Sequence, residues 1–282
     1  MFTQRKLFMS LSLALFATSA SADPLVYVFG TNYNNFTGLF GTMDPLTGTF
    51  NQIGPVISDP LGGLVPGPNG KLLGISASGN LDSINPATGA ISVIGATGLG
   101  DLAGVTGELN GTVYATDLNN NLYTVNTTTG ATSLIGPTGI PICPSLISPV
   151  EVSDEMLFAD GGKLYATFDG INLMTLALVD SPELYQINPA TGVATPVDPT
   201  LLGLGAAVLV SGSLYGFSND LGQAGNVVSL NPANGNTTFV TGYSPNAFAI
   251  TGAAATPEPA SFALVGIGIA AVLVSRRRKR LS

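Results

Sequence analysis

The chain repeats one pattern of apolar and polar positions. In each copy, a run in which apolar and polar residues alternate ends at Asn or Asp, and a Gly follows four residues later. The copies occupy residues 39–48, 81–89, 122–130, 184–192 and 227–235. Alternation with a period of two is typical of a half-buried strand, and Asn, Pro and Gly are the residues that form tight turns. A second apolar run follows each of the last four turns, at 91–94, 132–135, 193–197 and 237–240. The pattern therefore predicts five β-hairpins of one design.

The spacing of the hairpins predicts their assembly. The Asn or Asp at the start of each turn recurs after 41, 41, 62 and 43 residues, at positions 44, 85, 126, 188 and 231. A period of about 40 to 45 residues is that of a four-stranded propeller blade. In the third repeat the two further strands are expected at 102–106 and 112–116, and the second strand recurs at 26–29, 72–75, 164–167 and 214–217.

The two ends of the repeat region complement each other. The run at 247–251 resembles the first strand of a blade but has no blade after it, whereas the first repeat begins with a second-type strand. The last strand can complete the first blade and leave no open edge. We therefore predict an all-β, five-bladed β-propeller over residues 23–254. The alternative is an open array of hairpins or a β-solenoid, which the hairpin pattern would also suit.

The long spacing has two sources. About 10 extra residues lie between Gly136 and Lys163, and about 11 lie between Tyr165 and Tyr185. Because strands alternate in direction, both insertions should emerge on one face of the ring, which we call the insertion face. The Asn-Pro-Ala-Thr-Gly turns should emerge on the opposite face, which we call the turn face. Insertions gathered on one face of a repeat protein often carry its binding site, so the sequence favours the insertion face.

The loops expected on the insertion face are rich in Asn and Asp. As its binding residues we select Asp117, Asn119, Asp169 and Asp220. Residues 117–121 read Asp-Leu-Asn-Asn-Asn, which resembles the opening of a calcium loop but lacks its Gly and its final Glu. Calcium is thus one hypothesis, and the ordinary use of Asn and Asp in turns is the favoured one.

Charge and composition narrow the class of function. Of nine Lys and Arg residues, two lie in the first six positions and five lie in the last seven, so that only Lys71 and Lys163 stand among the seventeen acidic residues. Such a surface excludes nucleic acid, which binds through phosphate neutralisation. The chain has no His, which excludes a Ser-His-Asp triad and a His-based zinc site. The single Cys143 has no disulfide partner and is interpreted as an apolar loop residue.

Paired carboxylates leave an enzymatic alternative open. Asp154, Glu155, Asp160, Asp169 and Asp180 crowd around the insertions, and two carboxyl groups suffice to cleave a glycosidic bond. The chain has no Trp to stack on sugar rings. We therefore favour a protein that is not an enzyme and has no cofactor, with a polysaccharide-active enzyme as the alternative.

The N-terminus reads as an export signal. Arg5 and Lys6 precede an apolar run at 7–16, and Ala20 and Ala22 form a small-x-small cleavage site. This predicts a signal peptide over residues 1–22, removed by signal peptidase. The run is too short to favour the alternative, an N-terminal transmembrane helix.

The C-terminus has three parts. Pro257, Glu258 and Pro259 precede an uncharged, apolar stretch at 260–275, and a basic cluster closes the segment: Arg276, Arg277, Arg278, Lys279 and Arg280. The apolar stretch is just long enough to predict a transmembrane helix, with the basic cluster on the cytoplasmic side. We assign residues 255–282 to this segment.

This C-terminal segment resembles the PEP-CTERM sorting signal of Gram-negative bacteria that make exopolysaccharide. The resemblance implies that an exosortase, a membrane-embedded cysteine protease, recognises Pro257–Pro259 and removes the tail. The repeats resemble, more loosely, uncharacterised exported bacterial propellers. The resemblance implies an exported protein of the cell surface or extracellular matrix, transiently anchored in the inner membrane. We expect a non-catalytic binding or structural protein whose partner is exopolysaccharide or another surface protein.

Overall fold

A computed structural model describes residues 25–32, 35–99, 105–107, 111–117, 119–140, 151–172, 177–178, 183–199, 203–218, 225–243 and 248–255. The predicted signal peptide, the predicted C-terminal helix with its basic cluster, Cys143, Asp180 and Asp220 lie outside these residues. No helix within the described ranges is long and apolar enough to cross a membrane.

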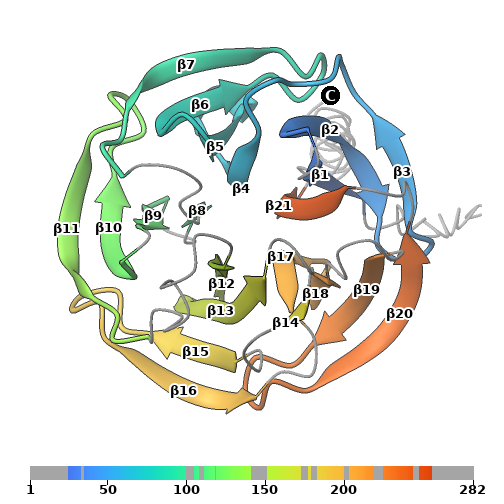
Figure 1. Ribbon diagram of the computed structural model, residues 1–282. Helices are drawn as coiled ribbons and strands as arrows, with labels where there is room; N and C mark the ends of the chain where they lie inside the picture. The colour runs from blue at the N-terminus through green and yellow to red at the C-terminus, as the bar shows by residue number, and fades with distance from the viewer. Residues whose placement is uncertain are drawn as a thin grey trace, which may run out of the picture.

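Five antiparallel sheets stand around a central axis as the blades of a propeller (Figure 1). From the axis outward, the first blade consists of β21 (Ala249–Ala255), β1 (Val26–Asn32), β2 (Thr37–Asp44) and β3 (Thr49–Gln52). The second consists of β4 (Leu61–Pro66), β5 (Leu72–Ser76), β6 (Asn80–Ile84) and β7 (Ile91–Ala96), with a short 3-10 turn, η1 (Pro68–Gly70), between its first two strands. The third consists of β8 (Val105–Gly107), β9 (Val113–Thr116), β10 (Asn121–Val125) and β11 (Thr132–Pro137).

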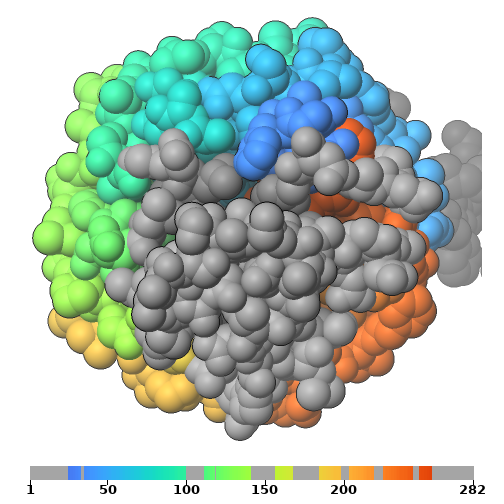
Figure 2. All heavy atoms as spheres, in the orientation of Figure 1, coloured from blue at the N-terminus to red at the C-terminus, as the bar shows by residue number. Residues whose placement is uncertain are grey.

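The last two blades continue the same order. The fourth consists of β12 (Glu151–Asp160), β13 (Lys163–Asn172), β15 (Glu183–Ile187) and β16 (Ala194–Pro199), with β14 (Ala177–Leu178) paired to β13. The fifth consists of β17 (Leu204–Val210), β18 (Ser213–Ser218), β19 (Gly225–Leu230) and β20 (Thr237–Tyr243). Figure 2 shows the blades following one another in chain order around the circumference. The predicted five-bladed architecture is confirmed.

The ring closes as predicted, by pairing of the last strand with the first. Strand β21 pairs antiparallel with β1, from Val26 opposite Ala255 to Thr31 opposite Ala249. The sequence placed this strand at 247–251, but it runs on to Ala255, one residue beyond the expected end of the propeller. A register shift lies between Phe29 and Gly30, and the pairing continues beyond it because β1 extends back to Val26, which stands opposite Ala255.

The repeated turns share one set of hydrogen bonds. At Asn85, the backbone oxygen accepts from the Gly89 amide at 2.8 Å, and the side-chain oxygen accepts from the Ala87 amide at 2.9 Å. The same side-chain bond recurs at 2.8 to 3.0 Å in the other four turns, from Asp44, Asn126, Asn188 and Asn231. The closing glycines have positive φ, as Gly130 shows at 80°, a conformation that costs a residue with a Cβ about 1–2 kcal/mol.

Glycines also join neighbouring blades, which the sequence did not predict. A Cβ on Gly130, in a turn of the third blade, would collide with the carbonyl oxygen of Gly95 in the outer strand of the second. The same approach pairs Gly54 with Gly89, Gly136 with Gly192, and Gly242 with Gly48. At the remaining seam, between the fourth and fifth blades, the sequence has Asp198 in the place of the outer-strand glycine. We call these four contacts the glycine contacts.

Replacing one of these glycines should therefore cost more than its backbone conformation alone. We expect Gly130→Ala to destabilise the protein by at least about 3 kcal/mol, since the positive φ and the collision with Gly95 add together. Gly98 is a matched control, because its φ is 77° and an added Cβ would meet nothing within 4 Å. Gly98→Ala should cost only about 1 kcal/mol. Denaturant unfolding of both variants measures the difference, and equal losses would show that the contact is not tight.

The insertions extend the fourth blade at one end. Strands β12 and β13 have 10 residues each, against six in β4 and five in β5. Their extensions pair with each other, with Glu151 opposite Asn172, and β14 adds to the end of β13 at Ile171 and Asn172. The described parts of both insertions therefore lie on the same face, opposite the turns, as the alternation of strands predicts. In the third blade, β8 begins at Val105, and residues 102–104 of the expected first strand lie outside the described ranges.

Candidate binding site

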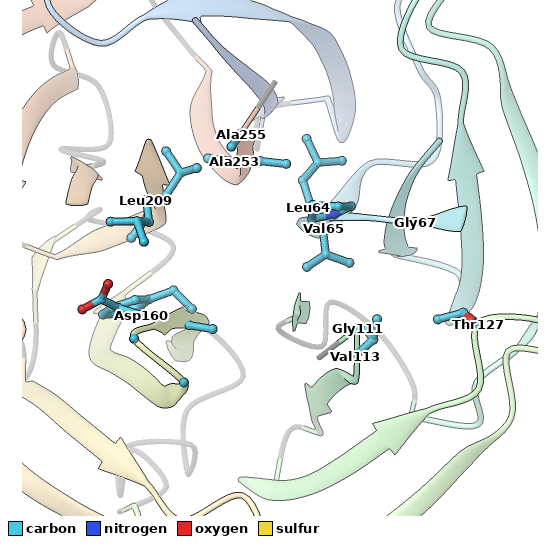
Figure 3. Close-up of a pocket in the computed structure, with 18 of the residues that line it drawn as sticks. Leu64, Val65, Gly67, Gly111, Val113, Thr127, Asp160, Leu209, Ala253 and Ala255 are labelled. Atoms are coloured by element: carbon cyan, nitrogen blue, oxygen red, sulfur yellow. The ribbon is translucent and has the colours of Figure 1, made fainter. Parts of the chain in front are cut away.

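A cavity of about 580 Å³ lies at the mouth of the central channel, on the turn face (Figure 3). The ends of the inner strands and the turns that follow them form its wall, including Leu64, Val65, Gly111, Leu209 and Ala253. Several of its lining residues are small, among them Gly67, Gly111, Ala207 and Ala253. We call this largely apolar cavity the vestibule.

Asp160 is the one charged residue among the described residues of that wall. It stands at the edge of the cavity, and its carboxylate is turned away from the centre (Figure 3). Asp160 belongs to the tight hairpin turn between β12 and β13, in which Gly161 and Gly162 both have positive φ. This turn makes Lys163 its cross-strand partner.

A second cavity, of about 400 Å³, adjoins the first at Asp160 and Gly161. It lies at the turn-face end of the seam between the fourth and fifth blades, and we call it the seam groove. Its remaining lining residues are Lys163, Tyr165, Gln186, Val197, Pro232 and Ala233. Pro232 and Ala233 come from the repeated turn of the fifth blade. The groove therefore has a polar wall from one blade and an apolar wall from the next.

The register of the fourth blade explains why the polar groups gather there. Asp160 pairs with Lys163, and Tyr165 pairs with both Phe158 and Gln186. Directly paired residues share one face of a sheet, as do residues two apart along a strand. The rings of Phe158 and Tyr165 stack with centroids 5.3 Å apart. The two buried rings therefore lie on the same face of the sheet as Asp160, Lys163 and Gln186.

Among its described residues, the groove contains one carboxylate, that of Asp160, and one ammonium group, that of Lys163. Burial, followed by the negative charge of Asp160, raises the pKa of the Tyr165 phenol. The phenol therefore stays protonated at neutral pH and keeps a hydrogen to donate. Lys163 and Gln186 supply further donors, and Asp160 and Gln186 supply acceptors. Such a mixed set suits a ligand rich in hydroxyl groups.

Asp117, a predicted binding residue, serves its own loop. Its Oδ1 accepts from the amides of Asn119 and Asn121 at 2.9 Å each and from the Asn121 side chain at 3.2 Å. Its Oδ2 accepts from the Asn121 side chain and the Tyr123 hydroxyl, both at 2.9 Å. Although burial opposes the charge, these hydrogen bonds lower the pKa of Asp117. Both oxygens are engaged, which favours the turn interpretation over calcium binding.

The other acidic residues do not form one cluster. Asp154 and Asp169 are direct cross-strand partners at the insertion end of β12 and β13. Asp160 stands at the other end of β12, six residues or about 20 Å away, so it lies apart from Asp154 and Asp169. Glu155 lies beside Asp154 in β12, and Asp180 and Asp220 fall outside the described residues. In the part of the chain that the structure describes, no three His, Cys, Asp or Glu side chains gather as a metal site would need.

Sequence reasoning missed Lys163 and Gln186 as site residues, and it missed the buried Asp82. Two features of the sequence could have drawn attention to Lys163 and Asp82. Lys71 and Lys163, the two basic residues of the propeller, both come directly after a Gly between the first and second strands of their blades. Asp82 stands where the third and fourth repeats have Tyr123 and Tyr185.

A comparison with models of known protein families gave a match at the C-terminus. Residues 255–279 match the PEP-CTERM protein-sorting motif, which confirms the predicted sorting segment. The motif is that of exported proteins sorted to the cell surface of Gram-negative bacteria, and it implies recognition by an exosortase. The match covers the tail and not the propeller. A comparison with curated protein sequences found no match.

Among solved structures, the chain is similar to TolB from Acinetobacter baumannii, with 12% identity and a TM-score of 0.47 over 84% of this chain and 68% of that one. It is also similar to a structural genomics protein of unknown function from Bacteroides thetaiotaomicron, with 14% identity and a TM-score of 0.48 over 78% of this chain and 58% of that one. A third is virginiamycin B lyase from Staphylococcus aureus, with 11% identity and a TM-score of 0.39 over 82% of this chain and 93% of that one. The chain thus spans less than two thirds of the length of the second of these proteins.

Proposed function

We propose that this protein is a non-catalytic binding propeller of the cell surface or extracellular matrix, and that it holds extracellular polysaccharide in the seam groove and the adjoining channel mouth. The observation that carries the proposal is the pairing of a mixed donor and acceptor wall, Asp160, Lys163, Tyr165 and Gln186, with a cavity of about 400 Å³. A sugar chain presents both hydroxyl donors and acceptors, and its apolar ring faces suit the vestibule next to the groove.

Three further features support binding without catalysis. The sorting motif is that of proteins sent to the cell surface, where we expect the protein to meet its polysaccharide. The seam groove has one carboxylate among its described residues, whereas glycoside hydrolysis uses two. The groove stands on a closed ring, which holds its walls without a moving part.

The test compares the two lysines of the propeller. The core at 23–256 is sedimented with the exopolysaccharide of the producing organism, with calcium and with chelator. Lys163→Ala should weaken retention about 10-fold, as expected for one hydrogen bond from a charged group. Lys71→Ala is the matched control, because Lys71 is exposed and follows the corresponding turn of the second blade outside the groove. Equal retention of the two variants would contradict the placement of the site, and no retention of the parent protein would exclude the polysaccharide.

One observation favours a second candidate, a polysaccharide-cleaving activity on the insertion face. Asp154 and Asp169 hold directly opposite positions in β12 and β13, and retaining glycosidases use two carboxyl groups about 5 Å apart. The same incubation distinguishes the two functions. Release of reducing ends that Asp154→Asn abolishes would support the enzyme, whereas a binding protein releases none.

A further inference from the structure

Both ends of the propeller core leave the ring at one place. Val26, at the start of β1, is the cross-strand partner of Ala255, at the end of β21. Ala255 belongs to the wall of the channel mouth (Figure 3). The C-terminal tail therefore departs from the turn face, beside the apolar vestibule.

The chain between this point and the apolar stretch is short. Only residues 256–259 separate Ala255 from Ala260, where the uncharged segment begins. Five residue steps reach at most about 18 Å. Strand β21 alone, with its seven residues, is about 23 Å long. A tether of this length cannot carry the insertion face round to a surface in which residues 260–275 are embedded.

The turn face is less acidic than the propeller as a whole. Lys71 and Lys163, both exposed, follow turns on this face and offset the charges of Asp44 and Asp160 on the same face, whereas the propeller as a whole is strongly acidic. Exposed apolar side chains occur on both faces, with Leu46 48% exposed on the turn face and Val56 57% exposed on the opposite one, so they do not decide between the faces. An acidic protein near anionic headgroups gains from turning a less acidic face toward them.

We propose that the turn face lies against the lipid headgroups while the tail is attached, and that the short tether sets this orientation. The vestibule and the seam groove then face the membrane. A polymer reaches them only after the tail is removed, so tail removal uncovers a site on this face. This orientation does not depend on which ligand the groove binds.

The experiment uses the chain from Asp23 to Ser282 in vesicles of phosphatidylcholine and phosphatidylglycerol. Cys143, the single cysteine, is replaced by Ala, and a fluorescent reporter is attached at Leu46→Cys or Val56→Cys. These positions are matched, because Leu46 and Val56 are 48% and 57% exposed. Leu46 lies on the turn face, and Val56 lies in the connection between the first two blades on the opposite face. Lipids with a nitroxide headgroup quench a reporter that is close to the membrane.

We expect the reporter at position 46 to be quenched several-fold more than the reporter at position 56. Insertion of a flexible Gly-Ser segment of about 20 residues after Ala255, with a mean span of about 25 Å, should remove the difference. Equal quenching without the insertion, stronger quenching at position 56, or failure of the chain to float with the vesicles would overturn the proposal. A difference that survives the insertion would overturn the role of the tether.

Discussion

Deletion of residues 248–282 is expected to abolish the cooperative unfolding of the propeller, whereas deletion of residues 257–282 should leave it unchanged. The first deletion removes β21, the inner strand of the first blade. Ile250 is 3% exposed and Ala254 is 2% exposed, so that this strand is part of the core. Without it, β1 becomes an open edge next to the axis.

The closing strand also joins two blades. The Thr251 hydroxyl donates to the Leu61 carbonyl of β4 at 2.9 Å, and Gly252 lies against the backbone of Gly63 and Leu64. Burial of an isoleucine contributes about 2–3 kcal/mol, and each lost backbone hydrogen bond about 1 kcal/mol more. The total exceeds about 5 kcal/mol, which is comparable to the whole stability of an ordinary domain.

Thermal unfolding followed by circular dichroism compares the two truncated chains. The chain that ends at Thr256 serves as the control, because it keeps every residue of β21. If the chain that ends at residue 247 unfolded cooperatively at the same midpoint, the blades would be stable without closure. That result would favour the open array of hairpins.

The architecture could be read from the sequence because each hairpin carries its own local signal. Asn85 and Gly89 specify a turn without help from distant residues, and five such turns at near-constant spacing leave few arrangements. The glycine contacts could not be predicted in this way, because each of them joins residues of two different blades. The turn conformation alone explains Gly130, and nothing in a single repeat shows that the carbonyl of Gly95 lies against it.

The site was harder to predict because it depends on the relation between blades. The sequence indicated the insertion face, where Asp117 proves to be bonded within its own loop. The seam groove combines Lys163 and Gln186 of one blade with Pro232 of the next. The spacing of residues within one repeat does not indicate which residues of two neighbouring blades lie together. The unusual position of Lys163 in an otherwise acidic chain was the available signal.

Asp82 should make the protein less stable as the pH rises through about 6. Its side chain is 3% exposed, in β6 on the side of the blade that faces the first blade. Burial, and next the charge of Asp59, raise the pKa of Asp82 to about 6, although a hydrogen bond with Ser76 lowers it. The folded state thus binds the proton more tightly than the unfolded chain, whose Asp pKa is about 3.9. The stabilising contribution is complete below about pH 4 and is lost as the pH rises past 6.

The hydrogen bonds around Asp82 offset only part of the cost of its charge. The Ser78 hydroxyl donates to Asp59 Oδ2 at 2.7 Å and lies 3.0 Å from the Ser76 hydroxyl. Ser78 therefore supplies no hydrogen to Asp82, and the hydrogen bond with Ser76 lowers the pKa of Asp82 less than burial and Asp59 raise it. Asp82 Oδ1 has no hydrogen-bond partner among the described residues, which adds to the cost of the charge.

Asp82→Asn is therefore expected to raise the free energy of unfolding by about 3 kcal/mol at pH 7.5, two pKa units at about 1.4 kcal/mol each, and to change little at pH 4. Denaturant unfolding across this pH range measures the effect.

Asp44→Asn removes one negative charge from an exposed turn and controls for net charge, so its stability difference from the parent should stay small at both pH values. Asp59→Asn should weaken the pH dependence, because it removes one cause of the raised pKa. Stability curves of Asp82→Asn and the parent that run parallel from pH 4 to 8 would show that Asp82 does not change its protonation between them.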